Sequence, residues 1–260
     1  MSDQPADGFR IVIPARYGST RLPGKPLIEI GGKPLIQHVW ERCRRSAATT
    51  VCIATDDARI AKACRGFGAD VAMTRADHPS GSDRVAEVIA ARGWANSDII
   101  VNVQGDEPCM AAALIDQVAA DLASRGDCAI ATLAYPIDDA RMLFDPHVVK
   151  VVTDKSGFAL YFSRAPVPWH RDELARDRER LPIGMTFLRH IGLYAYRAGT
   201  LARFVTWPPA PLERAEALEQ LRALWHGEPI HVGIAVDLPG PGVDKADDIG
   251  KVSAYLGLSD

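Results

Sequence analysis

Length, composition and charge set the first limits on this chain. Its 260 residues are 47% hydrophobic and 24% charged, which is the usage of a globular protein with enough chain for a sizeable core. The formal net charge of −3 argues against a nucleic-acid-binding protein, and no apolar run suggests a membrane span. The five cysteines are scattered without a C-x-x-C pair, and the acidic start does not resemble a signal peptide. We therefore expect a cytoplasmic globular protein with reduced thiols.

The first half of the chain alternates short apolar runs with helical patterns. The runs that predict buried strands occupy residues 9–15, 51–55, 70–73 and 98–104. The helical patterns cover residues 34–45, 58–67, 82–92 and 111–124. Continuous apolar strands separated by helices predict an α/β fold with a Rossmann-like, doubly wound, mostly parallel sheet. Ligands of such sheets bind beyond the carboxyl ends of the strands, so candidate site residues are sought there.

After a strand at 129–133 the alternation loosens. The later elements are predicted as strands at 148–153 and 158–162, a solvated helix or mobile loop at 171–180, a strand at 190–196, a helix at 212–225, a strand at 230–236 and a helix at 244–255. A turn-rich tetrapeptide at 154–157 makes the first two strands a hairpin. We expect a single domain spanning 1–260 with a β-rich insertion at about 148–200.

The first strand runs into a basic loop, residues 14–26, with the sequence PARYGSTRLPGKP. Residues 10–33 hold five cations and one acid, a local charge of +4 in an acidic chain. Donors suited to a triphosphate are Arg16, Ser19, Thr20, Arg21 and Lys25. The loop is not a Walker A motif, because five residues separate Gly18 from Gly24 and Pro26 stands where Ser or Thr would hold magnesium. A basic surface turn is the alternative interpretation.

Asp106 is a candidate ligand for a divalent cation. Asp106 follows the strand at 98–104, and Mg²⁺ prefers one or two carboxylates together with phosphate oxygens. Asp106 could instead lie in an acidic turn or cap the helix that starts near Ala111. Asp244 could simply be the N-cap of the last helix, with Asp247 in its first turn.

The basic loop resembles the signature loop of the sugar nucleotidyltransferases, in the form found in cytidylyltransferases that act on an acidic octulosonate. Further blocks that resemble this family are MTRADHPSGSDR at 73–84, VNVQGDEP at 101–108, YFSRA at 161–165, LRHIGLY at 188–194, PLE at 211–213 and LEQL at 218–221. These blocks follow one another in order and cover nearly the whole chain. The chain departs from the family after Asp244, where Lys-Ala-Asp-Asp replaces the usual Thr-Pro-Glu-Asp.

The resemblance implies an enzyme that transfers CMP from CTP to the anomeric hydroxyl of 3-deoxy-manno-octulosonate (Kdo), with release of pyrophosphate. It implies Mg²⁺ as cofactor, a homodimer, and a place in lipopolysaccharide assembly in a Gram-negative cytoplasm. The insertion at about 148–200 would then serve sugar binding and dimerisation. With no evident nucleophile–base pair, we expect direct displacement at the α-phosphorus without a covalent intermediate.

The site residues that the resemblance implies fall into four groups. The catalytic residues would be Lys25, Arg16 and Asp106, and the metal ligands Asp106 and Asp244. The nucleotide would contact Ala15, Arg16, Ser19, Arg21, Lys25, Thr74, Arg75 and Ser80, with the loop that holds the last three reading cytosine. Kdo would contact Gln104, Arg164, His190, Tyr194, Glu219 and Gln220.

Each acceptor residue also has a purely structural interpretation. His190 and Tyr194 lie on one strand and could simply pack, while Glu219 and Gln220 would normally face solvent on an amphipathic helix. Arg164 could pair with an acidic neighbour. Two other functions remain open: a cytidylyltransferase for sialic acid, and a nucleotide-binding regulator without catalysis. The blocks around Arg164 and His190 favour Kdo, and the presence of both Asp106 and Lys25 favours catalysis.

Overall fold

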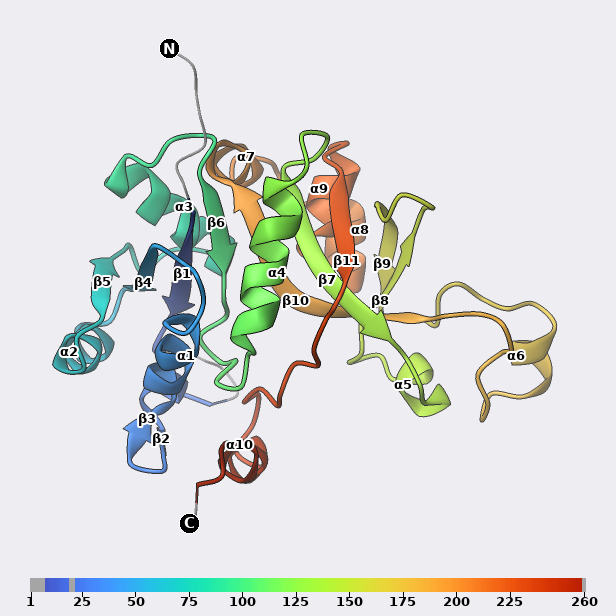
Figure 1. Ribbon diagram of the computed structural model, residues 1–260, viewed down its shortest axis with the longest axis horizontal. Helices are drawn as coiled ribbons and strands as arrows, with labels where there is room; N and C mark the ends of the chain where they lie inside the picture. The colour runs from blue at the N-terminus through green and yellow to red at the C-terminus, as the bar shows by residue number, and fades with distance from the viewer. Residues whose placement is uncertain (1–7, 19–21, 259–260) are drawn as a thin grey trace.

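A mainly parallel sheet forms the centre of the protein (Figure 1). The computed structural model describes residues 8–18 and 22–258, and within them nine strands form one sheet whose main path is β11-β7-β10-β6-β1-β4-β5. The bounds along this path are β11 (Ile230–Ile234), β7 (Ile130–Pro136), β10 (Leu188–Arg197), β6 (Ile99–Asn102), β1 (Phe9–Ala15), β4 (Thr50–Thr55) and β5 (Asp70–Met73). β10 runs antiparallel to β6 and β7, and the other pairs on the path are parallel. The predicted α/β fold is confirmed.

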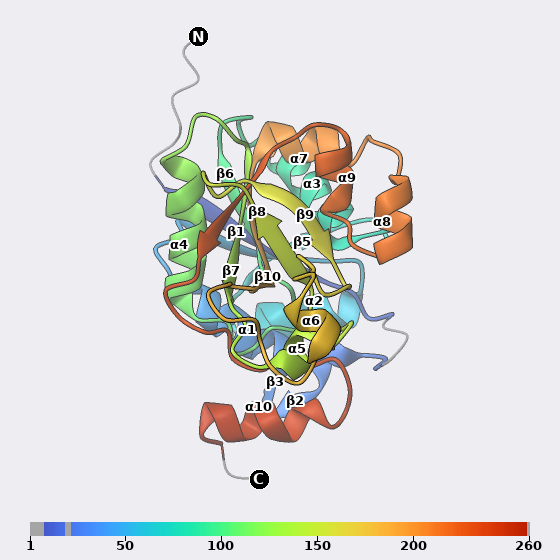
Figure 2. The same ribbon diagram turned by 90° about the vertical axis from the view of Figure 1, so that its right-hand side faces the viewer.

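Helices cover both faces of this sheet, with α4 on one side of the strands and α3, α7 and α9 on the other in Figure 2. One face is covered by α1 (Leu35–Cys43), α2 (Ala58–Gly66) and α4 (Ala112–Ala123), and the other by α3 (Gly81–Arg92), α7 (Ala198–Phe204) and α9 (Leu221–Trp225). β1 is continuously apolar because both of its faces are buried. Ile11 and Ile13 pack into the core under α1, α2 and α4, and Val12 packs into the core under α3, α7 and α9.

The predicted hairpin is present as β8 (Lys150–Thr153) and β9 (Ala159–Ser163), and β8 pairs with β10. The Asp154 carboxylate shapes its turn by accepting hydrogen bonds from the backbone N–H groups of Ser156 and Phe158. Helices α5 (Ala140–Phe144) and α6 (Glu173–Arg176) lie beyond the end of the sheet as a projecting lobe (Figure 1). Of the charged run at 171–180, only the single turn α6 is helical.

A fully buried lysine holds the base of this hairpin. The Lys150 Nζ donates to the carbonyl oxygens of Asp145 (2.9 Å), Val148 (2.7 Å) and Arg164 (2.6 Å), and burial lowers the pKa of its ammonium group. Lys150→Met would leave three carbonyls without this donor, so we expect the free energy of unfolding to fall by about 3 kcal/mol. Urea denaturation measures the change, with the exposed turn residue Lys155→Met as control. Equal midpoints for the two variants would contradict the prediction.

Two predicted helices differ in the structure. The stretch at 212–225 is not one helix but α8 (Pro211–Glu216) and α9, because Ala217 adopts a left-handed conformation with φ of 50° and breaks the helix. The last helix, α10 (Asp248–Leu256), begins four residues later than predicted. Asp244 is therefore not its N-cap; the Asp248 carboxylate instead accepts hydrogen bonds from the Asp244 and Lys245 amides and holds 244–247 as a turn.

Two segments that are far apart in the sequence meet at the carboxyl ends of β1 and β6: a short one after β1 and a long one after β11. The first contains the 3₁₀ helix η1 (Lys25–Leu27) and the hairpin of β2 (Glu29–Ile30) and β3 (Lys33–Pro34). The second runs from β11 to α10, which lies beside that hairpin in Figures 1 and 2. None of the described helices is long and apolar enough to cross a bilayer.

Candidate active site

A cavity of about 250 Å³ opens at the carboxyl ends of β1 and β6, which is where a ligand of a doubly wound sheet is expected to bind. Its wall is made by residues 14–16, 25–26, 78–81, Arg84, 104–106 and Asp244. The expected residues Ala15, Arg16, Lys25, Ser80, Gln104, Asp106 and Asp244 thus all line this first cavity. Residues Ser19 and Arg21, also expected here, lie outside the described residues.

The loop at 14–26, called the phosphate loop below, is closed by a backbone hydrogen bond from the Gly24 N–H to the Tyr17 carbonyl at 3.0 Å. Gly24 has φ of 71°, and a Cβ there would lie 3.1 Å from the Tyr17 ring, so only glycine fits without strain. The Arg59 guanidinium stacks over the same ring at 3.4 Å from its centroid. These contacts hold the loop next to α2 and direct Lys25 into the cavity.

Lys25 lies between the two candidate metal ligands. Its Nζ donates to Asp106 Oδ2 at 2.7 Å and to the Val243 carbonyl at 2.6 Å, and lies 3.9 Å from Asp244 Oδ1. The Val243 N–H also donates to the Asp106 carbonyl at 2.9 Å, which ties the segment before α10 to the segment after β6. A cation thus lies among oxygens contributed by two distant segments of the chain.

Glu107 was missed by the sequence analysis and adds to the negative charge at this point. Burial, and then the neighbouring carboxylates of Asp106 and Asp244, raise the pKa of Glu107 to about 8. Burial is the larger cause; the two neighbouring carboxylates add to it, and the charge of Lys25 offsets only part of the effect. Its position directly after Asp106 in the sequence was the only available signal.

The oxygens around Lys25 Nζ are of the kind that a hard divalent cation prefers. The Lys25 ammonium donates hydrogen bonds to a carboxylate oxygen of Asp106 and to the carbonyl oxygen of Val243, so this place binds a positive charge through oxygen atoms. No group of three His, Cys, Asp or Glu side chains in the described part of the chain is arranged as a metal site. A protein site with only Asp106 and Asp244 suits Mg²⁺, because that ion keeps several positions for water and substrate phosphates.

A second cavity of about 310 Å³ adjoins the first and shares Gln104 with it. Of the expected acceptor residues it contains Gln104 and His190; its other polar side chains are Glu107, Tyr135 and Arg189, which sequence reasoning did not single out. Arg189 stands next to His190 in the block LRHIGLY, so that block held the signal. Its guanidinium lies 5.5 Å from the Tyr135 ring centroid and brings a cation to the cavity.

His190 is held as a neutral imidazole. The Thr132 hydroxyl lies 2.7 Å from the Leu193 carbonyl, and because it has one proton to donate there, it accepts from His190 Nε2 at 3.0 Å. Nδ1 is then a hydrogen-bond acceptor, which suits a substrate hydroxyl. The ring packs between Phe162 and Tyr194, with centroids 5.0 and 5.3 Å away, and this burial lowers the pKa of His190 to about 3.

The low pKa of His190 predicts a loss of stability in acid. Between pH 6.5 and 3 the unfolded chain binds a proton at this position and the folded chain does not, so stability is fully present above pH 6.5 and falls as the pH is lowered. Lowering the pH from 7 to 5 should cost about 2 kcal/mol through this group. Denaturant unfolding at both pH values measures it: His190→Gln should flatten the dependence, whereas the exposed control His147→Gln should not.

Five side-chain atoms within the described residues are buried without a hydrogen-bond partner, and three of them belong to Asn102 (Oδ1), Tyr194 (Oη) and Glu219 (Oε1). Glu219 Oε1 lies 3.9 Å from the Arg222 guanidinium. Asn102 of β6 and Tyr194 of β10 are directly opposite each other in the antiparallel pair. The other carboxylate oxygen of Glu219, Oε2, accepts a hydrogen bond from the Ser82 hydroxyl at 2.7 Å. Glu219 is therefore only partly solvent-facing: its side chain is 33% exposed, but Oε1 is buried. Unpaired buried polar atoms suit a ligand rich in hydroxyls.

Four of the expected acceptor residues line neither of these two cavities, and as acceptor contacts they stay predictions: Arg164, Tyr194, Glu219 and Gln220. The Arg164 guanidinium donates to the backbone carbonyls of Glu216 (2.7 Å) and Pro146 (2.9 Å), so its partners are main-chain oxygens and not an acidic side chain. Gln220 is the residue that precedes α9.

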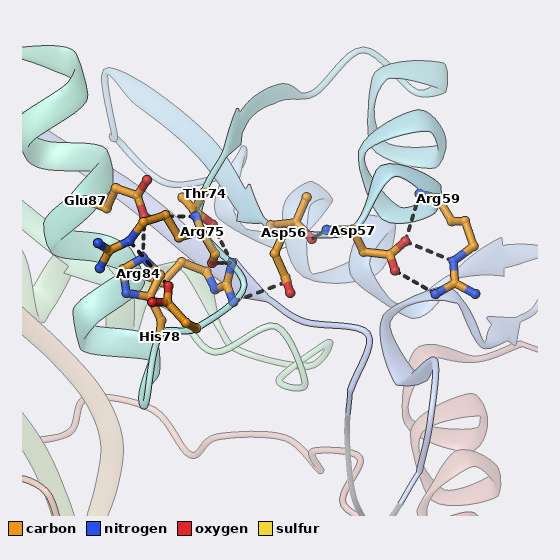
Figure 3. A network of polar contacts seen from close by, with 10 residues as sticks. Asp56, Asp57, Arg59, Thr74, Arg75, His78, Arg84 and Glu87 are labelled. Carbon is orange, nitrogen blue, oxygen red and sulfur yellow. Dashed lines mark hydrogen bonds and ion pairs between the residues drawn. The ribbon is translucent and has the colours of Figure 1, made fainter.

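Thr74, Arg75 and Ser80 lie in the loop between β5 and α3, called loop 74–80 below. Ser80 caps α3 and lines the first cavity, as does His78, which the sequence analysis did not assign. Thr74 and Arg75 lie behind this wall and interact with α3 (Figure 3).

Comparison with known proteins agrees with this geometry. Residues 10–230 match the family described as Cytidylyltransferase, and the chain belongs to that family. It is 58% identical to a protein of Pseudomonas fluorescens named 3-deoxy-manno-octulosonate cytidylyltransferase, over 96% of this chain and 99% of the relative. It is also 58% identical to a protein of the same name from Pseudomonas syringae pv. tomato, over 95% of this chain and 98% of the relative.

Solved structures give the same picture. A CMP:2-keto-3-deoxy-manno-octonic acid synthetase complexed with CTP is 40% identical and superposes with a TM-score of 0.86, over 96% of this chain and 98% of that one. A 4-diphosphocytidyl-2C-methyl-D-erythritol synthase shares the fold alone, with a TM-score of 0.62 at 16% identity.

Proposed function

We propose that this protein transfers CMP from CTP to the anomeric hydroxyl of Kdo and releases pyrophosphate, a reaction that supplies activated Kdo for lipopolysaccharide. The observation that carries the proposal is the cluster of Lys25, Asp106 and Asp244 in the first cavity. This cavity adjoins the second one, whose wall contains polar side chains. The relatives named for this activity, which match nearly the full chain at 58% identity, support it.

The chain's own residues suit a direct displacement. Arg16 and Lys25 of the phosphate loop line the first cavity and can neutralise a triphosphate. On the acceptor side, Arg189 provides a cation for the sugar carboxylate, and the side chains of Gln104 and His190 provide hydrogen-bond partners for its hydroxyls. Positioning and charge neutralisation are the main requirements of such a transfer.

Asp106 and Asp244 are proposed to hold Mg²⁺ in the working enzyme, together with phosphate oxygens of CTP. The bound metal would lower the pKa of the attacking hydroxyl and screen charge on the phosphates. In exchange, Lys25 would leave Asp106 and become available to the triphosphate.

Loop 74–80 is proposed to face the nucleobase. It contributes His78, Pro79 and Ser80 to the wall of the first cavity. Because cytosine and uracil differ in the donors and acceptors on one edge of the ring, a loop that distinguishes them must present its own polar groups at fixed positions.

Release of pyrophosphate tests the proposed reaction. The assay contains Mg²⁺ and compares CTP with UTP, and Kdo with sialic acid. We expect release only when CTP and Kdo are both present. Turnover with sialic acid but not with Kdo would overturn the acceptor assignment, and a nucleotidylated protein recovered after mixing with CTP alone would overturn direct displacement.

Two further proposals concern the state of the protein. A homodimer through the insertion at about 148–200 is supported by the exposed apolar side chains of Leu160, Trp169 and Ile183 on its hairpin and projecting lobe. Light scattering after size-exclusion chromatography would give the mass, and a monomer would contradict the proposal. A cytoplasmic location is supported by five buried cysteines that form no disulfide.

A further inference from the structure

The backbone of loop 74–80 has little support of its own. Thr74 N–H donates to the Thr55 carbonyl at 2.9 Å, and at the other end Ser80 belongs to the start of α3. Between them, no backbone–backbone hydrogen bond joins residues 75–79 to the rest of the described chain. Most of these side chains are exposed, so apolar packing does not hold the loop either. Its shape must come from side chains that reach it from neighbouring elements.

Glu87 of α3 supplies the first of these contacts. A single carboxylate oxygen, Oε2, accepts a hydrogen bond from the Arg75 backbone N–H at 3.1 Å and also contacts His78 Nε2. The two partners are three residues apart, so one carboxylate pins both ends of the turn between them. The bonds from His78 and the Arg75 amide lower the pKa of Glu87 in spite of its partial burial, so the group is ionised at neutral pH.

Arg84, one turn earlier on the same helix, supplies the second contact. Its guanidinium donates through Nη1 to the Thr74 hydroxyl and to the Arg75 carbonyl, the latter at 3.3 Å, and Nη2 lies 3.2 Å from Asp56 Oδ1. Figure 3 shows Arg84 between the loop and Asp56, which follows β4. The start of the loop is thus fastened to α3 and to the end of β4.

Glu87 does not line the first cavity, whereas His78 of the loop it holds does. It therefore acts on a ligand through the loop and not by contact. Arg84 is part of the cavity wall and could touch a nucleotide directly. For this reason Glu87, and not Arg84, isolates the effect of loop position.

We infer that Glu87 is a positioning residue that holds residues 75–78 in the conformation that distinguishes CTP from UTP. The inference rests on the proposed function, because it assumes that loop 74–80 reads the base. Loss of the carboxylate frees the Arg75 amide and His78 together, and the polar groups of the turn then no longer stand at fixed positions. A site that discriminates through fixed hydrogen-bonding groups loses that discrimination when they move.

The experiment measures kcat/KM for CTP and for UTP, with Kdo as acceptor, in wild type, Glu87→Ala and Glu87→Gln. We expect Glu87→Ala to lower the CTP:UTP ratio at least about tenfold, through a higher KM for CTP, with kcat and the KM for Kdo nearly unchanged. Glu87→Gln keeps an acceptor oxygen and should retain part of the discrimination. It also serves as the test variant should Glu87→Ala fail to fold.

Glu41→Ala is the matched control. Glu41 also lies on a helix, is bonded to two partners, Lys33 and Gln37, and is 29% exposed in its side chain against 31% for Glu87, but it lies outside both site cavities. We expect its CTP:UTP ratio to equal that of wild type. A merely structural role of Glu87 would lower the unfolding midpoint as Glu41→Ala does and leave the ratio unchanged, and that result would overturn the inference.

Failure of the proposed function would look different. If wild type showed no turnover of CTP with Kdo, the proposed reaction would be wrong, and the inference would be decided by calorimetric binding of CTP and UTP without acceptor. An unchanged binding ratio in Glu87→Ala would then overturn it, and a reduced ratio would support it.

Discussion

Asp106→Asn should lower kcat/KM for CMP transfer about 10³-fold, with no more than a small change in stability. The substitution keeps the shape of the side chain but removes the charge that binds Lys25 now and would bind Mg²⁺ during turnover. The main chain is unaffected, because the Asp106 carbonyl still accepts from the Val243 N–H. Initial rates of pyrophosphate release over a range of CTP concentrations at saturating Kdo measure kcat/KM, and thermal unfolding measures the stability.

Asp247→Asn is the control for this loss. Asp247 stands three residues after Asp244 on the same segment, but its side chain is 82% exposed and it lies outside the cavity wall. We expect activity close to that of wild type. If the two aspartate variants kept similar activity, the assignment of Asp106 to the reaction would be wrong.

Lys25→Met should abolish most of the activity and, at the same time, strengthen metal binding by the nucleotide-free protein. The loss of activity, about 10³-fold, follows from removing a cation that neutralises the triphosphate. The gain in metal affinity follows because the ammonium now bonded to Asp106 and the Val243 carbonyl would no longer compete for those oxygens. We expect Mg²⁺ or Mn²⁺ to bind about tenfold more tightly or better in a calorimetric titration without CTP.

The matched control is Lys245→Met. Lys245 is 65% exposed and lies 3.8 Å from Asp247, on the same segment as Asp244 but turned away from the cavity. Its loss should leave metal affinity and activity nearly unchanged. Equal or weaker metal binding by Lys25→Met would show that the Lys25 ammonium does not lie where the metal binds.

Most secondary structure could be predicted because it depends on neighbours along the chain. The strand at 9–15 has the predicted bounds as β1, and the hairpin at 148–162 was indicated by two apolar runs around a turn-rich tetrapeptide. The helix at 212–225 was predicted wrongly because its apolar spacing continues through Ala217. Nothing local marks the break. It coincides with hydrogen bonds that the Glu216 carboxylate accepts from the Ser163 hydroxyl and the Arg164 backbone N–H, in another part of the fold.

The candidate site shows the same division. The charge and composition of residues 14–26 were enough to predict a phosphate-binding loop, since glycines, hydroxyls and cations in one short segment need no partner to reveal their chemistry. The contacts of Lys25 join residues 81 and 218 positions apart, and no periodicity along the chain reports such pairs. Only the packing of strands β1 and β6 side by side, with the last segment of the chain laid across their ends, places these groups together. The same packing surrounds His190 with aromatic rings, buries one oxygen of Glu219 and places Glu87 behind loop 74–80. Helix and strand patterns depend on residues that are near in the sequence. Burial and long-range hydrogen bonds depend on which surfaces meet in the folded chain, and only the tertiary structure decides that.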